Sequence, residues 1–190
     1  MLKLTGYDIG FVITLLIWAV PEVWLLFRDR KLVPMGAKTN SKIMYYFSMM
    51  SILACLLLAK YNSLTIPVTQ DSRLLIGILI IWGGLLIRWW AIYSLGKYFT
   101  VVVAVKAGQK LIKNGPYKYI RHPSYTGSLL VGIGLGFGLG NWIGLAVMLI
   151  LPCISYLLRA VVEERVMVSS FGNDYLIYMS QTSRFIPFIH

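Results

Sequence analysis

A polar and aromatic segment near the middle of the chain reads Gly115-Pro116-Tyr117-Lys118-Tyr119-Ile120-Arg121-His122-Pro123-Ser124-Tyr125-Thr126-Gly127. Strongly apolar blocks lie on both sides of it. Its thirteen residues include two cations, a histidine, three tyrosines, two prolines and two glycines. A loop on a membrane surface does not need this set of groups, whereas a pocket for a charged, ring-bearing small molecule does. We therefore expect the rest of the chain to be an apolar scaffold that holds this segment at the edge of a bilayer.

Composition indicates an integral membrane protein. The 190 residues are 58% hydrophobic and 13% charged, with a mean hydropathy of +0.72. Soluble domains are about 45–50% apolar and about 25% charged. The length allows one domain over residues 1–190. The net charge of +11 fits the positive-inside rule and contact with anionic membrane lipids. Nucleic acid is a poorer interpretation, because no basic amphipathic face or binding motif accompanies the charge.

The cysteines and histidines do not predict a metal site. Cys55 and Cys153 each lie inside an apolar run, which favours reduced residues in the membrane core. The other histidine besides His122 is His190, at the end of the sequence, so no metal-ligand spacing occurs. At the start, Lys3 precedes an apolar run without a small-residue cleavage site. This pattern favours a retained membrane helix over a removed signal peptide.

Five apolar runs approach the roughly 20 residues that a membrane-spanning helix needs. They predict an all-α protein with about five transmembrane helices, at 9–27, 43–59, 74–95, 125–139 and 142–162. Pro21 and Glu22 in the first run suggest a kink and a polar group facing the protein interior or the interface. Residues 60–73 are expected to form a short polar loop. Gly140 and Asn141 alone separate the last two runs, which predicts a tight antiparallel hairpin.

Charge in the loops sets the expected orientation. With five spans, the loops after the first, third and fifth share a side, and these loops hold most of the basic residues. The positive-inside rule then places the connector 97–127 and the tail 159–188 together on the cytoplasmic side. The tail is expected to form an amphipathic helix through Phe171, Tyr175 and Tyr178 that stops at Pro187, although Gly172 weakens one continuous helix. Arg88, beside Trp89, Trp90 and Tyr93, is assigned to an aromatic belt.

Small residues recur along the fourth span at steps of four, which places them on one helix face. They are Ser128, Gly132, Gly136 and Gly140. Such a stripe lets helix backbones approach closely, and ordinary helix packing explains it. A groove for a lipid tail is the functional alternative. The run Gly132–Gly136 resembles a nucleotide-binding glycine loop only superficially, because no strand precedes it.

Charged residues at the end of the fifth span are the candidates for chemistry. Arg159 and Glu163 are four residues apart and share a helix face. They form either an interfacial ion pair or a polar wall of a site at membrane depth, where ionisable groups are costly. His122 has no carboxylate or cysteine in an obvious nucleophile–base arrangement.

Three blocks of sequence resemble the isoprenylcysteine carboxyl methyltransferase family. The first block is Gly115-Pro116-Tyr117 followed by Arg121-His122-Pro123-Ser124-Tyr125-Thr126-Gly127. The second is Glu163-Glu164 followed by Phe171-Gly172-Asn173-Asp174-Tyr175 and Tyr178, and the third, weaker one is Leu95-Gly96-Lys97-Tyr98-Phe99. Together they extend over about residues 95–188.

The resemblance implies methyl transfer from S-adenosylmethionine to the carboxylate of an isoprenylated cysteine, with no obligate protein partner. Arg159 and Glu163 would belong to the reaction centre. Either Arg159 or Arg184 would hold the substrate carboxylate, and Glu163 would hold Arg159 in place. The residues implied to contact the cofactor are Val102, Gln109, Lys110, Leu111, Ile112, Tyr117, His122, Pro123, Ser124 and Tyr125.

Departures from the family pattern leave other readings open. The basic cluster that eukaryotic prenylcysteine enzymes carry after the second tail tyrosine is replaced here by Met179-Ser180-Gln181-Thr182-Ser183. A small prenylcysteine or another lipid acid would serve as well as a prenylated protein. The alternatives are an NADPH-dependent sterol-type reductase, a phospholipid amine methyltransferase and a non-catalytic adaptor. Sterol-type reductases share Arg-His-Pro-x-Tyr-x-Gly but commonly follow it with an acidic residue, where this chain has Ser128.

Overall fold

The computed structural model describes residues 5–29, 38–58, 64–101, 103, 105 and 108–187. Over these ranges the chain is helical, as the sequence predicts, and pairing of extended backbone is limited to two isolated bridges. The elements are α1 (Gly6–Asp29), α2 (Lys38–Leu58), α3 (Gln70–Leu95), η2 (Gly96–Tyr98), η3 (Gly115–Lys118), α4 (Pro123–Leu139), α5 (Trp142–Phe171) and α6 (Asn173–Gln181). Residue 59, the expected end of the second span, lies outside the described residues, as do residues 30–37 between the first two helices.

Three of these helices are long and apolar enough to cross a membrane: Gly6–Leu25, Gln70–Tyr98 and Trp142–Phe171. Their outer surfaces expose large apolar side chains, including Leu16, Leu79 and Leu158. A soluble protein rarely exposes contiguous apolar surface of this kind. The chain is therefore a membrane protein with transmembrane helices, as composition predicts.

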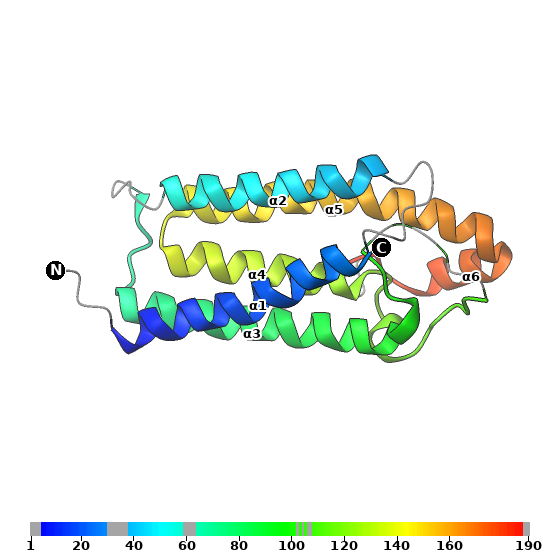
Figure 1. Ribbon diagram of the computed structural model, residues 1–190, viewed down its shortest axis with the longest axis horizontal. Helices are drawn as coiled ribbons and strands as arrows, with labels where there is room; N and C mark the ends of the chain where they lie inside the picture. Colours follow the sequence, from blue (N-terminus) through cyan, green and yellow to red (C-terminus); the bar gives the residue numbers. More distant parts are fainter. Residues whose placement is uncertain are drawn as a thin grey trace.

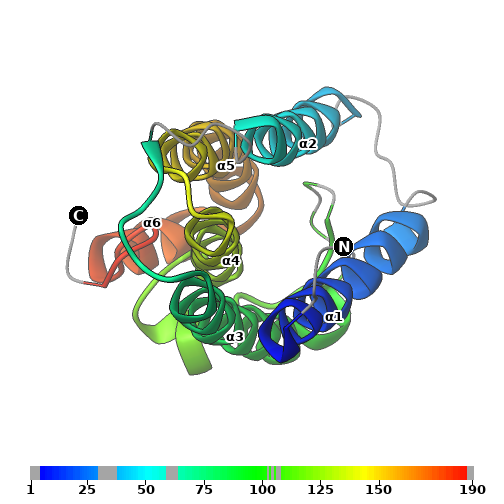
Figure 2. The ribbon, with the colours of Figure 1, turned by 90° about the vertical axis from the view of Figure 1, so that its left-hand side faces the viewer.

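The helices form an arc in the order α1, α3, α4, α5, α2 (Figure 2). In Figure 1 they run side by side along the length of the molecule, while α6 folds back beside the end of α5. Pro21 lies inside α1, where a proline removes one helical hydrogen bond. The second half of α1 turns away from α3 in both views, which agrees with the kink expected at this proline.

Close contact between glycines joins α3 to α4. A Cβ added at Gly84 would lie 2.5 Å from the carbonyl oxygen of Gly127, and one added at Gly77 would lie 2.8 Å from that of Gly134. On another face of α4, a Cβ added at Gly132 would lie 3.1 Å from the carbonyl oxygen of Met148 in α5. The small residues of the fourth apolar run therefore pack helices together, as predicted.

The α4–α5 hairpin also follows the prediction. Gly140 ends α4 with a φ of +78°, which a residue with a side chain rarely adopts. Asn141 then caps α5, its side-chain oxygen accepting hydrogen bonds from the backbone N–H groups of Ile143 (3.0 Å) and Gly144 (3.1 Å). These bonds satisfy donors that have no partner within the helix.

Two helix boundaries differ from those expected. α3 begins at Gln70, because the hydroxyl of Thr69 accepts a hydrogen bond from the backbone N–H of Ser72 and caps the helix. The expected polar loop therefore ends before residue 70. α5 continues past residue 162 to Phe171, so Glu163 and Glu164, directly after the predicted end, lie inside the helix.

The tail is not one amphipathic helix. Gly172, with a φ of +56°, ends α5, and α6 runs from Asn173 to Gln181. Residues 182–185, here termed the C-terminal strap, then lie against the polar and aromatic segment 115–127. Arg121 N–H donates to the Ser183 carbonyl (2.8 Å) and His122 N–H to the Arg184 carbonyl (3.1 Å). The tail thus returns to the start of α4.

Candidate active site

A cavity of about 440 Å³ lies on the inner side of the helix arc and reaches the connector and α6. Most residues implied to contact a cofactor line it, together with Arg159 and Glu163. These are Gln109, Lys110, Leu111, Ile112, Tyr117, His122, Ser124 and Tyr125. Pro123 is fully buried in the first turn of α4 and does not line the cavity, so a cofactor contact is not expected there. Val102 lies outside the described residues.

Three aromatic rings stack along one wall of the cavity. The ring centroids of His122 and Tyr125 are 5.2 Å apart with an interplanar angle of 5°. Tyr156, from α5, stacks on the other side of Tyr125 at 5.0 Å and 12°. The Arg159 guanidinium lies 5.8 Å from the centroid of the Tyr125 ring. Such a wall can accommodate flat or cationic groups.

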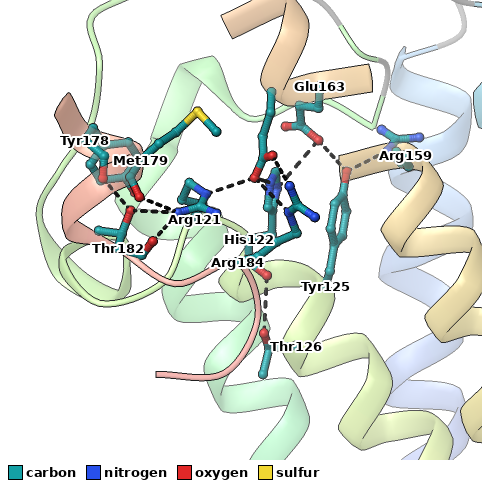
Figure 3. A network of polar contacts seen from close by, with 11 residues as sticks. Arg121, His122, Tyr125, Thr126, Arg159, Glu163, Tyr178, Met179, Thr182 and Arg184 are labelled. Atoms are coloured by element: carbon teal, nitrogen blue, oxygen red, sulfur yellow. Dashed lines mark hydrogen bonds and ion pairs between the residues drawn. The ribbon is translucent and has the colours of Figure 1, made fainter. Parts of the chain in front are cut away.

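The hydroxyl of Tyr125 joins Arg159 to Glu163 (Figure 3). Arg159 Nε donates to this hydroxyl over 2.6 Å, and the hydroxyl donates to Glu163 Oε2 over 2.6 Å. The ion pair expected from the four-residue spacing is therefore mediated by a side chain of α4. The sequence missed this arrangement because a partner from another helix does not appear in the spacing.

Apart from this bond, only some N–H groups of the Arg159 guanidinium have hydrogen-bond partners. Its Nη2 group donates to the carbonyl oxygen of Val101, in the connector. Its Nη1 group is buried and has no hydrogen-bond partner among the described residues. Buried guanidinium groups are costly unless their N–H groups are paired. Since Arg159 lines the cavity, its Nη1 group is suited to bind an anionic oxygen there.

Glu164, the neighbour of Glu163, belongs to a different cluster. It accepts hydrogen bonds from Arg121 Nε (2.9 Å) and Arg184 Nη2 (2.6 Å), and its Oε1 lies 3.2 Å from His122 Nε2. His122 therefore does have a carboxylate neighbour, contrary to the sequence interpretation. Hydrogen bonding to Glu164 raises the pKa of Arg184. Because Arg184 is already bound to this carboxylate, Arg159 is the better candidate for a substrate carboxylate.

The connector and the tail are fastened to one another. Tyr178 donates its hydroxyl hydrogen to the Tyr117 carbonyl over 2.7 Å. Thr126 Oγ1 donates to the Phe185 carbonyl over 2.7 Å. Burial raises the pKa of Tyr117 and of Tyr178, so both phenols are neutral near pH 7. These bonds hold the connector against α6 and the start of α4 against the C-terminal strap.

Arg88 is not part of an aromatic belt. It is buried, and its Nε and Nη2 groups bind the two oxygens of Glu22 in α1, the second at 2.7 Å. Its Nη1 group donates to the hydroxyls of Ser124 (2.6 Å) and Ser128 (3.0 Å). The sequence did contain a signal for this pair, because Glu22 and Arg88 are opposite charges inside two different apolar runs. Charged residues in such runs usually pair inside the protein.

The fold and the cavity define a helical membrane protein with an internal cavity lined by polar and aromatic side chains. The phospholipid methyltransferase family matches residues 72–174. The chain belongs to this family, and its predicted resemblance to isoprenylcysteine carboxyl methyltransferases is confirmed.

Individual relatives support the same grouping. The chain is 32% identical over 108 residues to the protein-S-isoprenylcysteine O-methyltransferase of Schizosaccharomyces pombe, over 56% of this chain and 46% of that protein. It is 28% identical over 116 residues to protein-S-isoprenylcysteine O-methyltransferase B of Arabidopsis thaliana, over 60% of this chain and 59% of that protein. The chain thus spans about half the length of these relatives.

A solved structure shares the fold. It is that of a eukaryotic intramembrane Ras methyltransferase, an isoprenylcysteine carboxyl methyltransferase. The two align with a TM-score of 0.63 and 23% sequence identity, over 85% of this chain and 56% of the other. The two proteins therefore share their helix arrangement.

Proposed function

We propose that this chain is an S-adenosylmethionine-dependent carboxyl O-methyltransferase that acts on an isoprenylated cysteine, or a similar lipid acid, at the membrane–cytosol interface. The observation that best supports the proposal is the Nη1 group of Arg159, which is buried in the wall of the cavity and has no hydrogen-bond partner among the described residues. A carboxylate would satisfy this group. The names of the relatives point to the same acceptor chemistry.

The residues of the connector side fit the proposed cofactor. Leu111 and Ile112 offer an apolar wall for an adenine ring, and Gln109 and Lys110 offer polar groups beside it. The aromatic ring of Tyr117, which lines the cavity, suits a cationic sulfur. When bound, S-adenosylmethionine supplies a methyl group that an oxygen nucleophile can accept. His122 is held by Glu164 through Nε2, so its expected bond to the cofactor carboxylate would have to use Nδ1.

The proposed reaction asks the protein for orientation and not for a base, because a carboxylate is already ionised at neutral pH. Arg159 binds one carboxylate oxygen through Nη1 and so fixes the direction of the other. Tyr125 and Glu163 hold the Nε side of Arg159 in place. The surrounding helices line the cavity and would limit the entry of water, which strengthens these polar contacts.

The lipid part of the acceptor would occupy the apolar end of the cavity. Val131 and Leu135 of α4, Met148 of α5 and Ile52 of α2 line this end. We further propose that α2 and α4 also span the bilayer, giving five spans. The basic connector and the tail would then lie on the cytoplasmic side, where the cofactor enters. No protein partner is required in this proposal.

Binding of the cofactor product tests the proposal. Purified protein in detergent should bind S-adenosylhomocysteine in a calorimetric titration and should not bind NADPH. Saturable NADPH binding without S-adenosylhomocysteine binding would favour the sterol-type reductase.

The family description favours one second candidate, methylation of a phospholipid amine. An amine must lose a proton before or during transfer, so this reaction needs a base. Glu163 is the cavity carboxylate nearest the reaction centre, but it already accepts a hydrogen bond from Tyr125. The stability of the product separates the two reactions, since base hydrolyses a methyl ester and leaves an N-methyl group intact.

A further inference from the structure

A second pair of charged residues lines the cavity, in addition to Arg159 and Glu163. It consists of Glu22 of α1 and Arg88 of α3, and both residues line the cavity. The proposed reaction assigns it no role. Arg88 is buried and Glu22 is partly buried among apolar helices, where two charges are stable only when they are closely matched.

Every nitrogen of the Arg88 guanidinium has a hydrogen-bond partner. Its Nε and Nη2 groups bind Glu22, and its Nη1 group donates to both the hydroxyl and the carbonyl oxygen of Ser124, at 2.6 and 3.2 Å. Arg159 differs, because its buried Nη1 group has no partner among the described residues. Arg88 instead fixes the Glu22 carboxylate against the first turns of α4.

Glu22 retains accessible surface. Its side chain is 25% exposed, whereas that of Arg88 is 7% exposed. A carboxylate can accept about four hydrogen bonds, and Arg88 supplies two of them. Because Arg88 neutralises the pair, Glu22 does not repel a second carboxylate nearby as a lone anion would. What the exposed part of Glu22 can bind is a hydrogen-bond donor.

The pair lies close to the reaction centre on its apolar side. Arg88 binds Ser128, which is three residues, about one helical turn, beyond Tyr125 in α4. Tyr156, one turn before Arg159 in α5, stacks on Tyr125 and lines the same cavity. A lipid-modified amino acid would therefore lie beside the Glu22–Arg88 pair if its carboxylate bound Arg159 and its lipid chain packed among Val131 and Leu135.

We propose that Glu22, held by Arg88, is a specificity-determining residue that accepts a hydrogen bond from the nitrogen next to the acceptor carboxylate. The inference rests on the proposed function and adds the substrate class: an amino-acid lipid with an amide N–H or an ammonium group, in preference to a simple lipid acid. Arg88 is a positioning residue in this scheme.

Three farnesylated acids test the proposal. N-acetyl-S-farnesylcysteine has an amide N–H, S-farnesylcysteine has an ammonium group, and S-farnesyl-3-mercaptopropionic acid has no nitrogen. Affinities for the full-length protein in detergent are measured by calorimetry, so no turnover is required. Wild-type protein should bind at least one nitrogen-bearing acid about tenfold more tightly than the nitrogen-free acid, because hydrogen bonds to charged groups are strong. The preferred acid distinguishes the amide from the ammonium donor.

Glu22→Gln should reduce this preference to about threefold or less. The control Asp8→Asn makes the same change near the start of α1, outside the cavity, and should retain the wild-type ratio. If Glu22→Gln does not fold, because it leaves Arg88 unpaired, Glu22→Gln with Arg88→Gln removes both charges and should show the same loss. A purely structural role would alter the affinities for all three acids together and leave their ratio unchanged.

Equal affinity of the wild-type protein for all three acids would overturn the proposal. It would also be overturned if folded Glu22 variants kept the wild-type ratio between the affinities for the nitrogen-bearing and the nitrogen-free acids. The outcome is separable from the proposed function. A preserved nitrogen preference without methyl transfer would contradict the proposed reaction and still support the role of Glu22.

Discussion

The hydroxyl of Tyr125 donates a 2.6 Å hydrogen bond to Glu163, and this bond joins the first turn of α4 to the end of α5 beside the cavity. The same hydroxyl accepts from Arg159 Nε. One phenol thus determines where a carboxylate and a guanidinium lie relative to each other. Arg159 keeps its buried Nη1 group for a ligand, because its other nitrogens are held by Tyr125 and the Val101 carbonyl.

Tyr125→Phe should lower kcat about 10- to 100-fold, because Arg159 loses the partner that orients it. The aromatic stack remains, so the affinity for S-adenosylhomocysteine should stay within about threefold. Methyl-transfer rates and calorimetry measure the two effects. Tyr119→Phe is the control, because Tyr119 is exposed and does not line the cavity. A kcat equal to that of wild type would remove the Tyr125 hydroxyl from the mechanism.

Arg159→Ala should lower kcat/KM for a farnesylated cysteine about 100- to 1000-fold, the range seen when one donor to a reacting oxygen is lost. Cofactor affinity should be preserved. Arg165→Ala removes an exposed arginine from the same helix and should leave the rate unchanged. If Arg184→Ala abolished transfer while Arg159→Ala did not, Arg184 would be the residue that holds the substrate.

Glu163 and Glu164 should respond differently to removal of their charge. Glu164→Gln leaves Arg121 and Arg184 without a carboxylate and should destabilise the fold by about 3–5 kcal/mol. Glu163→Gln should lower the stability by less than about 1 kcal/mol, because Glu163 is partly exposed and the amide oxygen of the glutamine can still accept a hydrogen bond from Tyr125. Thermal unfolding in detergent compares the two. Equal melting temperatures would contradict a structural role for the ion pairs of Glu164 with Arg121 and Arg184.

Two neighbouring glycines of α3 provide a test of packing. Gly84→Ala should destabilise the protein by about 1–3 kcal/mol, because its Cβ would lie 2.5 Å from the Gly127 carbonyl oxygen of α4. Gly83→Ala meets nothing within 4 Å and should be neutral or slightly stabilising. The melting temperatures of the two variants measure the difference. A tolerated Gly84→Ala would contradict the close approach of α3 and α4.

The proposed orientation can be checked by labelling single cysteines in a background without Cys55 and Cys153. Lys118→Cys in η3 should react with a membrane-impermeant maleimide only from the cytoplasmic side. Val68→Cys, exposed just before the start of α3, should react only from the opposite side. Labelling of both positions from the same side would overturn the five-span topology.

Local patterns predicted the helices, the kink at Pro21, the α4–α5 hairpin and the glycine packing. Each depends on neighbours in sequence: an apolar run, a proline, a Gly-Asn break, a repeat of four. The same reasoning was wrong for the start of α3, because the cap at Thr69 is a weaker signal than the end of an apolar run. It was also wrong for the tail, where the positive φ of Gly172 splits one helix into two.

The site was predicted as a set of residues but not as a geometry. Eight of the ten expected cofactor residues line the cavity, and four of them, Tyr117, His122, Ser124 and Tyr125, belong to the first block of the family resemblance. The pairing of Arg159 with Glu163 through Tyr125, of Glu164 with His122, and of Glu22 with Arg88 joins residues on different helices. Only the relative placement of helices decides such pairs, and no single-sequence spacing encodes it.

Radiolabelled methyl transfer from S-adenosylmethionine, with N-acetyl-S-farnesylcysteine, palmitic acid and phosphatidylethanolamine as separate acceptors, tests the central claim most directly. The account predicts label in the farnesylated cysteine, released by mild base as methanol, and none in Arg159→Ala. Base-stable label in phosphatidylethanolamine, with none in the farnesylated cysteine, would contradict it.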